Sequence, residues 1–433
     1  MSEHAVMKGR LNLFQAAMLR WRELHPYNAV HIVELAQRFD RSRLERAIAT
    51  ELESMGLTGL TLDRARRRYE YRGGPATFEL EIVAQDADTS VATRVEIERQ
   101  LNRPFPLDGA IDPFRFFVFA DGERFRVGLA YDHFVAGGDS IVVLLNNIVD
   151  RYVGTVGERA SPALYPPTFR RLVVREAAAF IAGLGALPRI AASCRRGKRP
   201  RYDDDTDGYN AFDYIALPAP SARAMQTKAR ALGVTFNDLL IALTLKALAS
   251  EFPAAARRGR RREVAVASIF NLRGASRFDS RDAFGQFLSS MRISHSMPDE
   301  LSLDAVARDV HRETERFKNR KLYLQMLLAV RINAIVWWFL DLRQRQRFYA
   351  KAYPVLAGLT SLNVDALWRR PDGATAPDYL RAVPTGPIAP LVIAATTCGG
   401  AVAFGFSYRR SGLDAGKIAR IARYFAESVR AFQ

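Results

Sequence analysis

One short stretch of the chain, from Tyr131 to Ser140, most narrows the folds that this sequence can adopt. Two apolar, β-favouring runs precede it, Phe114–Ala120 and Arg124–Tyr131, joined through Asp121-Gly122. An Asp-Gly pair between such runs predicts a β-hairpin, because a type I′ turn needs positive φ at both central residues. The run that follows, Ile141–Tyr152, carries apolar side chains at helical spacing. The sequence therefore predicts a hairpin, a glycine turn and a helix in immediate succession.

His133 lies in this stretch, where the second predicted strand ends. The backbone there can hold an imidazole rigidly, while Gly137 and Gly138 leave room for a substrate beside it. A histidine at such a place can be a structural residue or a general base, and one residue alone does not decide between them. Asp139 or Ser140 is the expected N-cap of the helix that follows.

The stretch resembles the HHxxxDG signature of condensation-type acyltransferases. This superfamily contains the condensation domains of nonribosomal peptide synthetases, wax ester synthases, plant alcohol acyltransferases and chloramphenicol acetyltransferase. The segment Asn102–Pro106 and the aromatic hairpin before the motif add to the resemblance. It implies that His133, at the second histidine of the signature, is the catalytic base and that Gly138 is its final glycine.

Two positions depart from the signature. Asp132 stands at the first histidine, and Gly137 stands where the signature has aspartate. In the family that aspartate is regarded as structural, because it holds the loop through an arginine. Asp139, two positions later, is a candidate for the missing carboxylate. Arg273, after a predicted strand, is expected to pair with a carboxylate or orient a loop, or alternatively to meet an anionic ligand.

Two further segments resemble wax ester synthases. Asn237 and Asp238 match an Asn-Asp pair near the active-site tunnel of those enzymes, while Asp238, three residues after Thr235, also predicts a capping box by itself. Ser361 and Asn363 belong to a segment that resembles a Ser-Asn-Val strand of the same enzymes. The resemblance implies that these residues line the tunnel or contact substrate.

The length of 433 residues exceeds what one core usually supports, so two domains are expected. The resemblance implies an α/β fold of two chloramphenicol-acetyltransferase-like lobes, each a mixed sheet with flanking helices, and an active-site tunnel between them. We expect an N-terminal lobe over 1–153 that carries His133, and a C-terminal lobe over 208–433. Prolines and short charged blocks favour a linker over 154–207, interrupted by a helix near 168–183.

The formal net charge of +17 predicts a positive surface potential. It favours a nucleic acid, an anionic membrane, a phosphorylated cofactor such as coenzyme A, or an acidic carrier protein as partner, unless it reflects only an arginine-rich composition. No zinc-ligand spacing or RNA-binding signature accompanies the charge, so nucleic acid is not expected. The apolar stretch Leu324–Leu340, followed by arginines, predicts a core helix or an acyl-tunnel wall, or alternatively a peripheral membrane contact.

The cysteines and the N-terminus bear on the compartment. Cys194 and Cys398 are the only cysteines, which argues against a disulfide framework and favours a cytoplasmic location. They are too few, with six histidines that do not cluster, to predict a metal site. The first ten residues lack the apolar segment of a secretion signal. Leu324–Leu340 is interrupted by Arg331 and Asn333 and is short for a transmembrane helix.

The resemblance implies transfer of an acyl group from a thioester to an alcohol or amine of a small-molecule acceptor. The thioester would be acyl-CoA or the acyl-phosphopantetheine of a carrier protein, acting as co-substrate, with no permanently bound cofactor. His133 would take the acceptor's proton, and a backbone N–H of Gly137 or Gly138 would meet the oxyanion. The altered motif leaves open a catalytically inactive condensation-like protein that binds an acyl or carrier-protein ligand.

Overall fold

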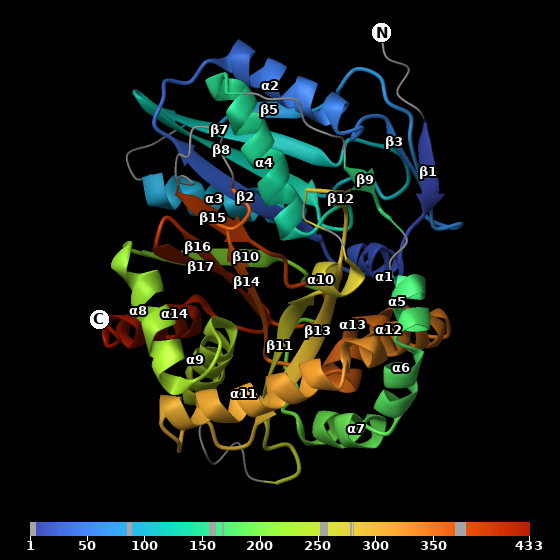
Figure 1. The fold of residues 1–433 in the computed structure, drawn as a ribbon, viewed down its shortest axis with the longest axis vertical. Coiled ribbons are helices and arrows are strands. Elements are labelled where there is room, and N and C mark those ends of the chain that lie inside the picture. Colours follow the sequence, from blue (N-terminus) through green and yellow to red (C-terminus); the bar gives the residue numbers. More distant parts are fainter. Residues whose placement is uncertain are drawn as a thin grey trace.

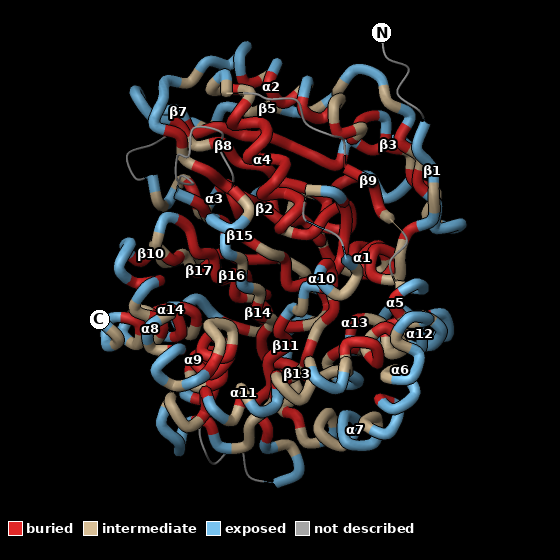
Figure 2. The backbone as a smooth tube through the Cα atoms, in the orientation of Figure 1, coloured by how far each residue is buried: buried red, intermediate tan, exposed pale blue. Residues whose placement is uncertain are grey.

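The computed structural model describes residues 6–84, 89–155, 162–166, 169–251, 259–277, 279, 281–368 and 378–433. Two lobes, each with its own large sheet, are stacked along the long axis of the molecule (Figure 1). The buried segments are concentrated in the two sheets and in the helices that flank them (Figure 2). The predicted α/β fold with two mixed-sheet lobes is confirmed.

The N-terminal lobe contains a five-stranded sheet with the order β15-β2-β8-β7-β5. Side chains alternate between its two faces, so Val33 and Leu129 join the core under α2 and α4, whereas Ile32 and Phe117 join the core under α3. These elements are β2 (Asn28–Leu35), β5 (Glu79–Ile82), β7 (Phe114–Asp121), β8 (Arg124–Asp132), β15 (Tyr379–Ala382), α2 (Arg41–Ser54), α3 (Thr89–Asn102) and α4 (Gly138–Val153). The predicted hairpin is β7 and β8, paired with Asp121 opposite Arg124.

The C-terminal lobe contains a six-stranded sheet with the order β10-β17-β16-β14-β11-β13. Helix α9 is buried along most of its length, between this sheet and the outer helices α8, α11 and α14. The strands are β10 (Asn210–Leu217), β11 (Val264–Asn271), β13 (Leu288–His295), β14 (Ala357–Asn363), β16 (Leu391–Cys398) and β17 (Ala401–Arg409). The helices are α8 (Pro220–Leu232), α9 (Phe236–Ser250), α11 (Leu303–Asn319) and α14 (Ala415–Arg430).

Smaller elements surround the two sheets. A four-stranded sheet, β1-β4-β3-β6, lies at the edge of the N-terminal lobe. Helices α12 and α13 lie beside α5 and α6 on one flank (Figure 1). The bounds are β1 (Met7–Arg10), α1 (Leu13–Arg22), β3 (Leu60–Asp63), β4 (Arg68–Tyr71), β6 (Gly109–Ile111), α5 (Phe169–Arg175), α6 (Ala177–Leu184), α7 (Leu187–Arg196), α10 (Arg273–Ser276), α12 (Tyr323–Trp338) and α13 (Leu342–Ala352).

Two strand pairings join segments that are far apart in the sequence. Strand β15 comes from the C-terminal part of the chain but pairs with β2 in the N-terminal sheet, with Arg381 opposite His31. Strand β9 (Ala163–Leu164) pairs in parallel with β12 (Ala283–Phe284). These pairings fix the lobes relative to each other, because each ties one lobe's backbone to a segment of the other half of the chain.

The region between 154 and 207, which the sequence assigns to a linker with one helix, contains α5, α6 and α7. The expected N-cap of α4 is wrong. Gly137 is the N-cap, with φ −80° and ψ 161°, and Asp139 and Ser140 lie inside the first turn. The reason is tertiary, because the Asp139 carboxylate is held by residues of the C-terminal lobe, as shown below.

Candidate active site

The turn that carries His133 is held by backbone contacts on several sides. Strand β8 ends at Asp132, and the His133 N–H donates to the Tyr27 carbonyl at 3.1 Å. From the C-terminal lobe, Gln286 Nε2 donates to the carbonyls of both His133 and Ala136. The motif is therefore clamped between the two halves of the chain. Sequence reasoning gave Gln286 no site role, because its partner lies 153 positions away.

The His133 side chain is 8% exposed and lies among aromatic rings. Its centroid is 5.4 Å from the Tyr27 ring and 5.7 Å from the Tyr131 ring. Burial lowers the pKa of His133 to about 4; the Ala136 carbonyl opposes this shift, and the Arg381 charge adds to it. The imidazole is therefore neutral at physiological pH, which is the form that accepts a proton.

Asp139 and Arg273 form a buried ion pair between α4 and α10. Arg273 Nε donates to Asp139 Oδ2, and Arg273 Nη2 donates to Ser140 Oγ at 2.6 Å. Asn271 Nδ2 also donates to Asp139 Oδ2, at 3.2 Å. This pair brings together two residues that the sequence singled out separately. Because the Arg273 charge is neutralised within the chain, the arrangement favours the orienting role over the binding of an anionic ligand.

Asp132, at the first histidine of the signature, is also in a buried ion pair. Its Oδ2 lies 2.7 Å from Arg22 Nη1, and both side chains are almost fully buried. Burial raises the pKa of Asp132 to about 6, and the Arg22 charge opposes the shift. Arg22 Nη2 donates further to the carbonyls of Phe105 and Pro106, at 3.1 and 2.6 Å. The segment around residues 102–106 is thus tied to the motif through Arg22.

The two motif glycines are not equivalent. The Gly137 N–H donates to the Gly285 carbonyl at 3.0 Å, so it is not free to meet an oxyanion. The Gly138 N–H makes no hydrogen bond with any residue that the structure describes. A Cβ at Gly138 would lie 3.2 Å from Arg381 Nη1 and 3.6 Å from His31 Cε1. Gly138 therefore lets these two side chains approach the start of α4 closely.

Arg381 and His31 belong to a buried cluster that sequence reasoning missed. His31 Nδ1 lies 2.7 Å from the Tyr379 hydroxyl, and His31 Nε2 lies 3.4 Å from the Tyr131 hydroxyl. Burial lowers the pKa of His31, and the charge of Arg381 lowers it further. Only the pairing of β15 with β2 brings these residues together, so no local pattern could have indicated them.

The four residues assigned to the tunnel in the C-terminal lobe separate into two groups. Ser361 Oγ donates to Asn237 Oδ1 at 3.1 Å, and the Ser361 and Asn363 side chains are exposed on β14. Arg381 Nη2 lies 3.5 Å from the carbonyl of Thr360, which places this strand beside the buried cluster.

Asp238 differs from that group. It forms the capping box with Thr235 and accepts hydrogen bonds from His311 Nδ1 and Thr314 Oγ1, each at 2.7 Å. The capping interpretation therefore describes Asp238, whose carboxylate is engaged with α11 rather than with the exposed residues of β14.

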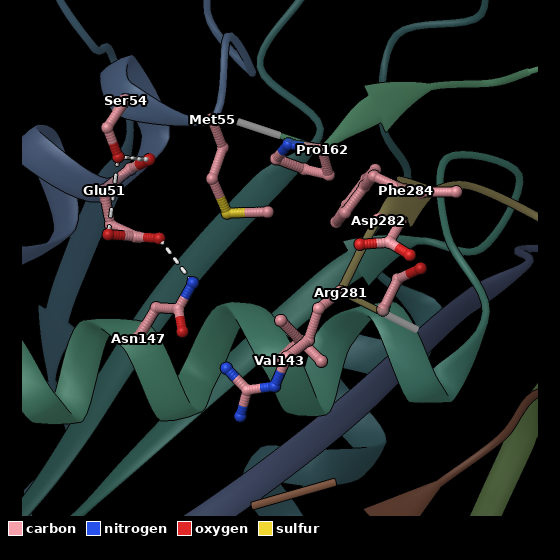
Figure 3. A pocket seen from close by; sticks show the side chains of 11 residues that line it. Glu51, Ser54, Met55, Val143, Asn147, Pro162, Arg281, Asp282 and Phe284 are labelled. Carbon is pink, nitrogen blue, oxygen red and sulfur yellow. Dashed lines mark hydrogen bonds between the residues drawn. The ribbon is translucent and has the colours of Figure 1, made fainter. Parts of the chain in front are cut away.

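A cavity of about 230 Å³ lies near the motif but does not include His133. Ser140, Val143 and Asn147 line it from α4, and Met55 and Phe284 close other sides (Figure 3). On one wall, Asn147 Nδ2 donates to Glu51 Oε1 at 2.7 Å, and no residue from 131 to 139 lines the cavity. We therefore place the candidate site at His133 and not in this cavity.

The described residues include no group of histidine, cysteine, aspartate and glutamate side chains arranged to hold a metal ion. Among the same residues, no single helix has the length and apolar character needed to cross a membrane. Two bent helix pairs, α6 with α7 and α8 with α9, meet the criteria by length and composition only.

Comparison with known proteins identifies the fold. Neither a protein-family model nor a curated protein matches this sequence. Among solved structures, the first condensation domain of the CDA synthetase matches with a TM-score of 0.67 at 14% identity, over 100% of this chain and 97% of that domain. The condensation domain of the Monacolin K polyketide synthase MokA gives 0.65 at 13%, over 99% and 97%.

SgcC5 from Streptomyces globisporus is also similar, with a TM-score of 0.65 at 14% identity, over 98% of each chain. At these identities the likeness concerns the fold. The chain has the condensation-domain fold over its whole length, which confirms the fold that the motif resemblance implies.

Proposed function

We propose that the protein is an acyltransferase that moves an acyl group from a thioester to the hydroxyl or amine of a small acceptor. The observation that carries this proposal is His133: a neutral, buried imidazole at a strand end, on a backbone that Tyr27 and Gln286 hold in place. A base with a fixed position and an uncharged resting state is the main group that such a transfer needs.

The reaction would proceed without a covalent enzyme intermediate. The acceptor oxygen or nitrogen forms a bond to the thioester carbonyl carbon while its proton moves to the imidazole of His133. The carbon–sulfur bond of the tetrahedral intermediate then breaks, and the imidazolium returns the proton to the departing thiolate. The Gly138 N–H, which is free of partners in the described chain, is the backbone donor available for the oxyanion.

The donor would be acyl-CoA or the acyl-phosphopantetheine of a carrier protein. The net charge of +17 supports a donor that carries phosphate or an acidic carrier surface. The fold supports the carrier in particular, since several similar structures are domains of peptide or polyketide synthetases. Release of free thiol from acyl-CoA or from an acylated carrier protein, measured side by side, separates the two donors.

A second function is favoured by the altered motif. With Asp132 and Gly137 in place of histidine and aspartate, the protein would bind an acyl or carrier-protein ligand without turnover. This alternative predicts saturable binding of a thioester with no thiol release, whatever acceptor is supplied.

The test is thiol release from a panel of acyl-CoA and acyl-pantetheine thioesters with alcohol and amine acceptors. We expect His133→Ala to lower turnover about 10²–10⁴-fold, the usual contribution of a general base. His295→Ala is the matched control, because His295 lies on β13 and contacts Asp309 away from the motif. A His133→Ala protein that melts like wild type and turns over within a few-fold of it would reject His133 as the base.

A further inference from the structure

Arg381 carries a buried charge that the chain itself does not neutralise. The residue is 2% exposed, at the inner end of β15. In the part of the chain that the structure describes, no carboxylate lies within ion-pair distance of its guanidinium. The acid that acts on it electrostatically is Asp139, whose carboxylate is already held by Arg273. A buried charge without a counter-ion is unfavourable, so a buried arginine without an acidic partner calls for a functional explanation.

The donors of Arg381 are only partly used. Its Nε donates to Thr396 Oγ1 at 2.9 Å, and its Nη2 donates to the carbonyls of Ala395 and Thr360 at 2.8 and 3.5 Å. These bonds orient the guanidinium but bring no negative charge. Its Nη1 makes no hydrogen bond to any described residue and faces Gly138, at 3.2 Å from the position of a Cβ there.

The start of α4 adds a second positive feature at the same place. Gly138 is the first residue of this 16-residue helix; its N–H makes no hydrogen bond in the described chain, whereas the Ser140 N–H donates to Asp139 Oδ1 at 3.0 Å. Free N–H groups at a helix N-terminus carry partial positive charge and favour anions. Arg381 Nη1 thus lies beside Gly138 at the start of α4, and the charge of Arg381 is close enough to lower the pKa of His133.

We propose that Arg381 binds a carboxylate of the substrate beside the start of α4, so that the acyl group or the acceptor bears a free acid. A group that is negative in the resting complex neutralises the guanidinium throughout the reaction, whereas an oxyanion exists only transiently. The unused Nη1 can donate a charge-assisted hydrogen bond to a carboxylate oxygen, which is shorter and stronger than a bond between neutral groups. Carboxylate binding at Arg381 can be measured without turnover. That the carboxylate belongs to a substrate rests on the proposed acyl transfer.

The first test measures binding without turnover, by titrating the full chain with hexanoate and with hexanamide. These probes have similar size and differ in charge. We expect hexanoate to bind at least tenfold more tightly than hexanamide, and Arg381→Gln to abolish that difference. Arg331→Gln, at an exposed position on α12, removes the same charge from the surface and should leave the difference unchanged.

Two further variants keep the test informative if Arg381→Gln does not fold. Arg381→Lys retains the charge but not the planar guanidinium, and should keep part of the preference. Gly138→Ala retains every charge but places a methyl group against Nη1, and should weaken hexanoate binding. Equal binding of acid and amide by folded wild-type protein, or a preference that survives Arg381→Gln, would overturn the assignment.

Turnover separates this inference from the proposed function. If Arg381→Gln slows transfer equally for substrates with and without a carboxylate, Arg381 serves the oxyanion and the carboxylate assignment is wrong. If hexanoate binds as expected but no thioester is turned over, the binding site stands and the acyltransferase proposal fails.

A second inference rests on an independent surface, at the corner where α12 ends and α13 begins. Trp338 and Phe339 are 81% and 78% exposed there, and Ile335 and Leu342 are each 60% exposed. We call these four residues the α12–α13 corner. Two adjacent aromatic side chains in full contact with water are costly, and such apolar groups mark an interaction site.

The sequence around the corner is rich in basic residues. Helix α6 lies beside the first turn of α12, where Gln325 Nε2 donates to the Phe180 carbonyl at 2.9 Å. Residues 323–352 carry five lysines and arginines and a single acid, Asp341. That acid caps α13.

We infer that the α12–α13 corner docks on an anionic lipid surface. Aromatic tips insert at the level of the headgroups while arginines meet the lipid phosphates, a combination that binds membranes rather than a neutral protein face. The excess of cations favours this partner over a second copy of the chain, which would bring the same positive charge to the contact.

Flotation with vesicles of phosphatidylglycerol and phosphatidylcholine, mixed and pure, tests this inference on the full chain. We expect flotation only when phosphatidylglycerol is present, and its loss in the double variant Trp338→Gln/Phe339→Gln. Val95→Gln on α3 is the control, because Val95 is also exposed but lies on the other lobe. Absence of flotation, or a dimer that the double variant converts to monomer, would overturn the membrane assignment.

Discussion

The buried ion pair between Asp139 and Arg273 gives the sharpest stability prediction. Asp139→Asn keeps the shape of the side chain but removes its charge, leaving Arg273 buried with only neutral acceptors: Ser140 Oγ and the carbonyls of Asp279 and Ala283. Asp132→Asn is the matched comparison, because Asp132 is also buried and paired with an arginine. The two sites differ because burial raises the pKa of Asp132 and thereby favours its neutral form.

The expected magnitudes follow from that difference. Removing one partner of a buried ion pair typically costs 3–5 kcal/mol, so Asp139→Asn should lower the free energy of unfolding by about that amount. With about 2.1 cal/mol/K per residue, 433 residues that unfold together correspond to a loss of roughly 3–6 °C in Tm. Burial raises the pKa of Asp132 to about 6, so a neutral side chain is tolerated there. Arg22 also keeps two carbonyl acceptors, and Asp132→Asn should therefore cost about 1 kcal/mol or less.

Urea unfolding at pH 7, followed by circular dichroism and by tryptophan fluorescence, measures both variants. The double variant Asp139→Asn/Arg273→Met closes the cycle, and should recover part of the loss because the unpaired charge is gone. Equal losses in Asp139→Asn and Asp132→Asn, or a double variant that is no more stable than Asp139→Asn, would refute the reasoning that Asp139 supplies the orienting carboxylate.

Three other predictions concern pH and salt. Burial holds the pKa of His133 at about 4, so kcat/KM should decrease on the acid side near pH 4 rather than near pH 6.5. Arg381→Gln should move this decrease to higher pH, because the Arg381 charge lowers the pKa of His133. A decrease near pH 6.5 in the wild type would contradict the assignment. The folded-state pKa of Asp132 is raised, so its protonated form contributes stability below about pH 4 that is lost as pH rises to about 6. The wild type should therefore lose on the order of 2–3 kcal/mol relative to Asp132→Asn across this window, measured by urea unfolding at each pH. The KM of the thioester donor should rise with ionic strength while the KM of a neutral acceptor changes little, because the Debye length falls from roughly 10 Å at 0.1 M to 3 Å at 1 M; equal responses would mean that the positive charge serves another partner.

Much of the local structure follows from sequence patterns. The β7–β8 hairpin, the capping box at Thr235 and the helix after the motif were all predicted and are confirmed. The type I′ turn with Asp121-Gly122 at its centre is wrong, because Asp121 pairs with Arg124 and only Gly122 has positive φ in the turn. The confirmed features depend on positive φ at a turn, on side-chain oxygens at a helix start and on helical spacing of apolar residues, and each involves neighbouring residues only. The resemblance of the stretch around His133 to the HHxxxDG signature also implied the fold.

The surroundings of His133 depended on contacts that no local pattern records. Gln286 reaches the His133 carbonyl from 153 positions away, and His31 meets Tyr379 across 348 positions, because strand β15 crosses into the N-terminal sheet. The N-cap of α4 was mispredicted for the same reason, since Arg273 engages the Asp139 carboxylate from the other lobe.

What the sequence by itself determined is therefore the hairpin, the glycine turn and the helix around the motif, and the identity of the one histidine at the end of β8. The pairing of buried charges was decided only in the tertiary structure. A charge enclosed at low dielectric must find its partner wherever the fold places one, and Asp139 and Asp132 find theirs in Arg273 and Arg22. Arg381 has no such partner in the described chain, and we therefore assign its counter-charge to a carboxylate of the substrate.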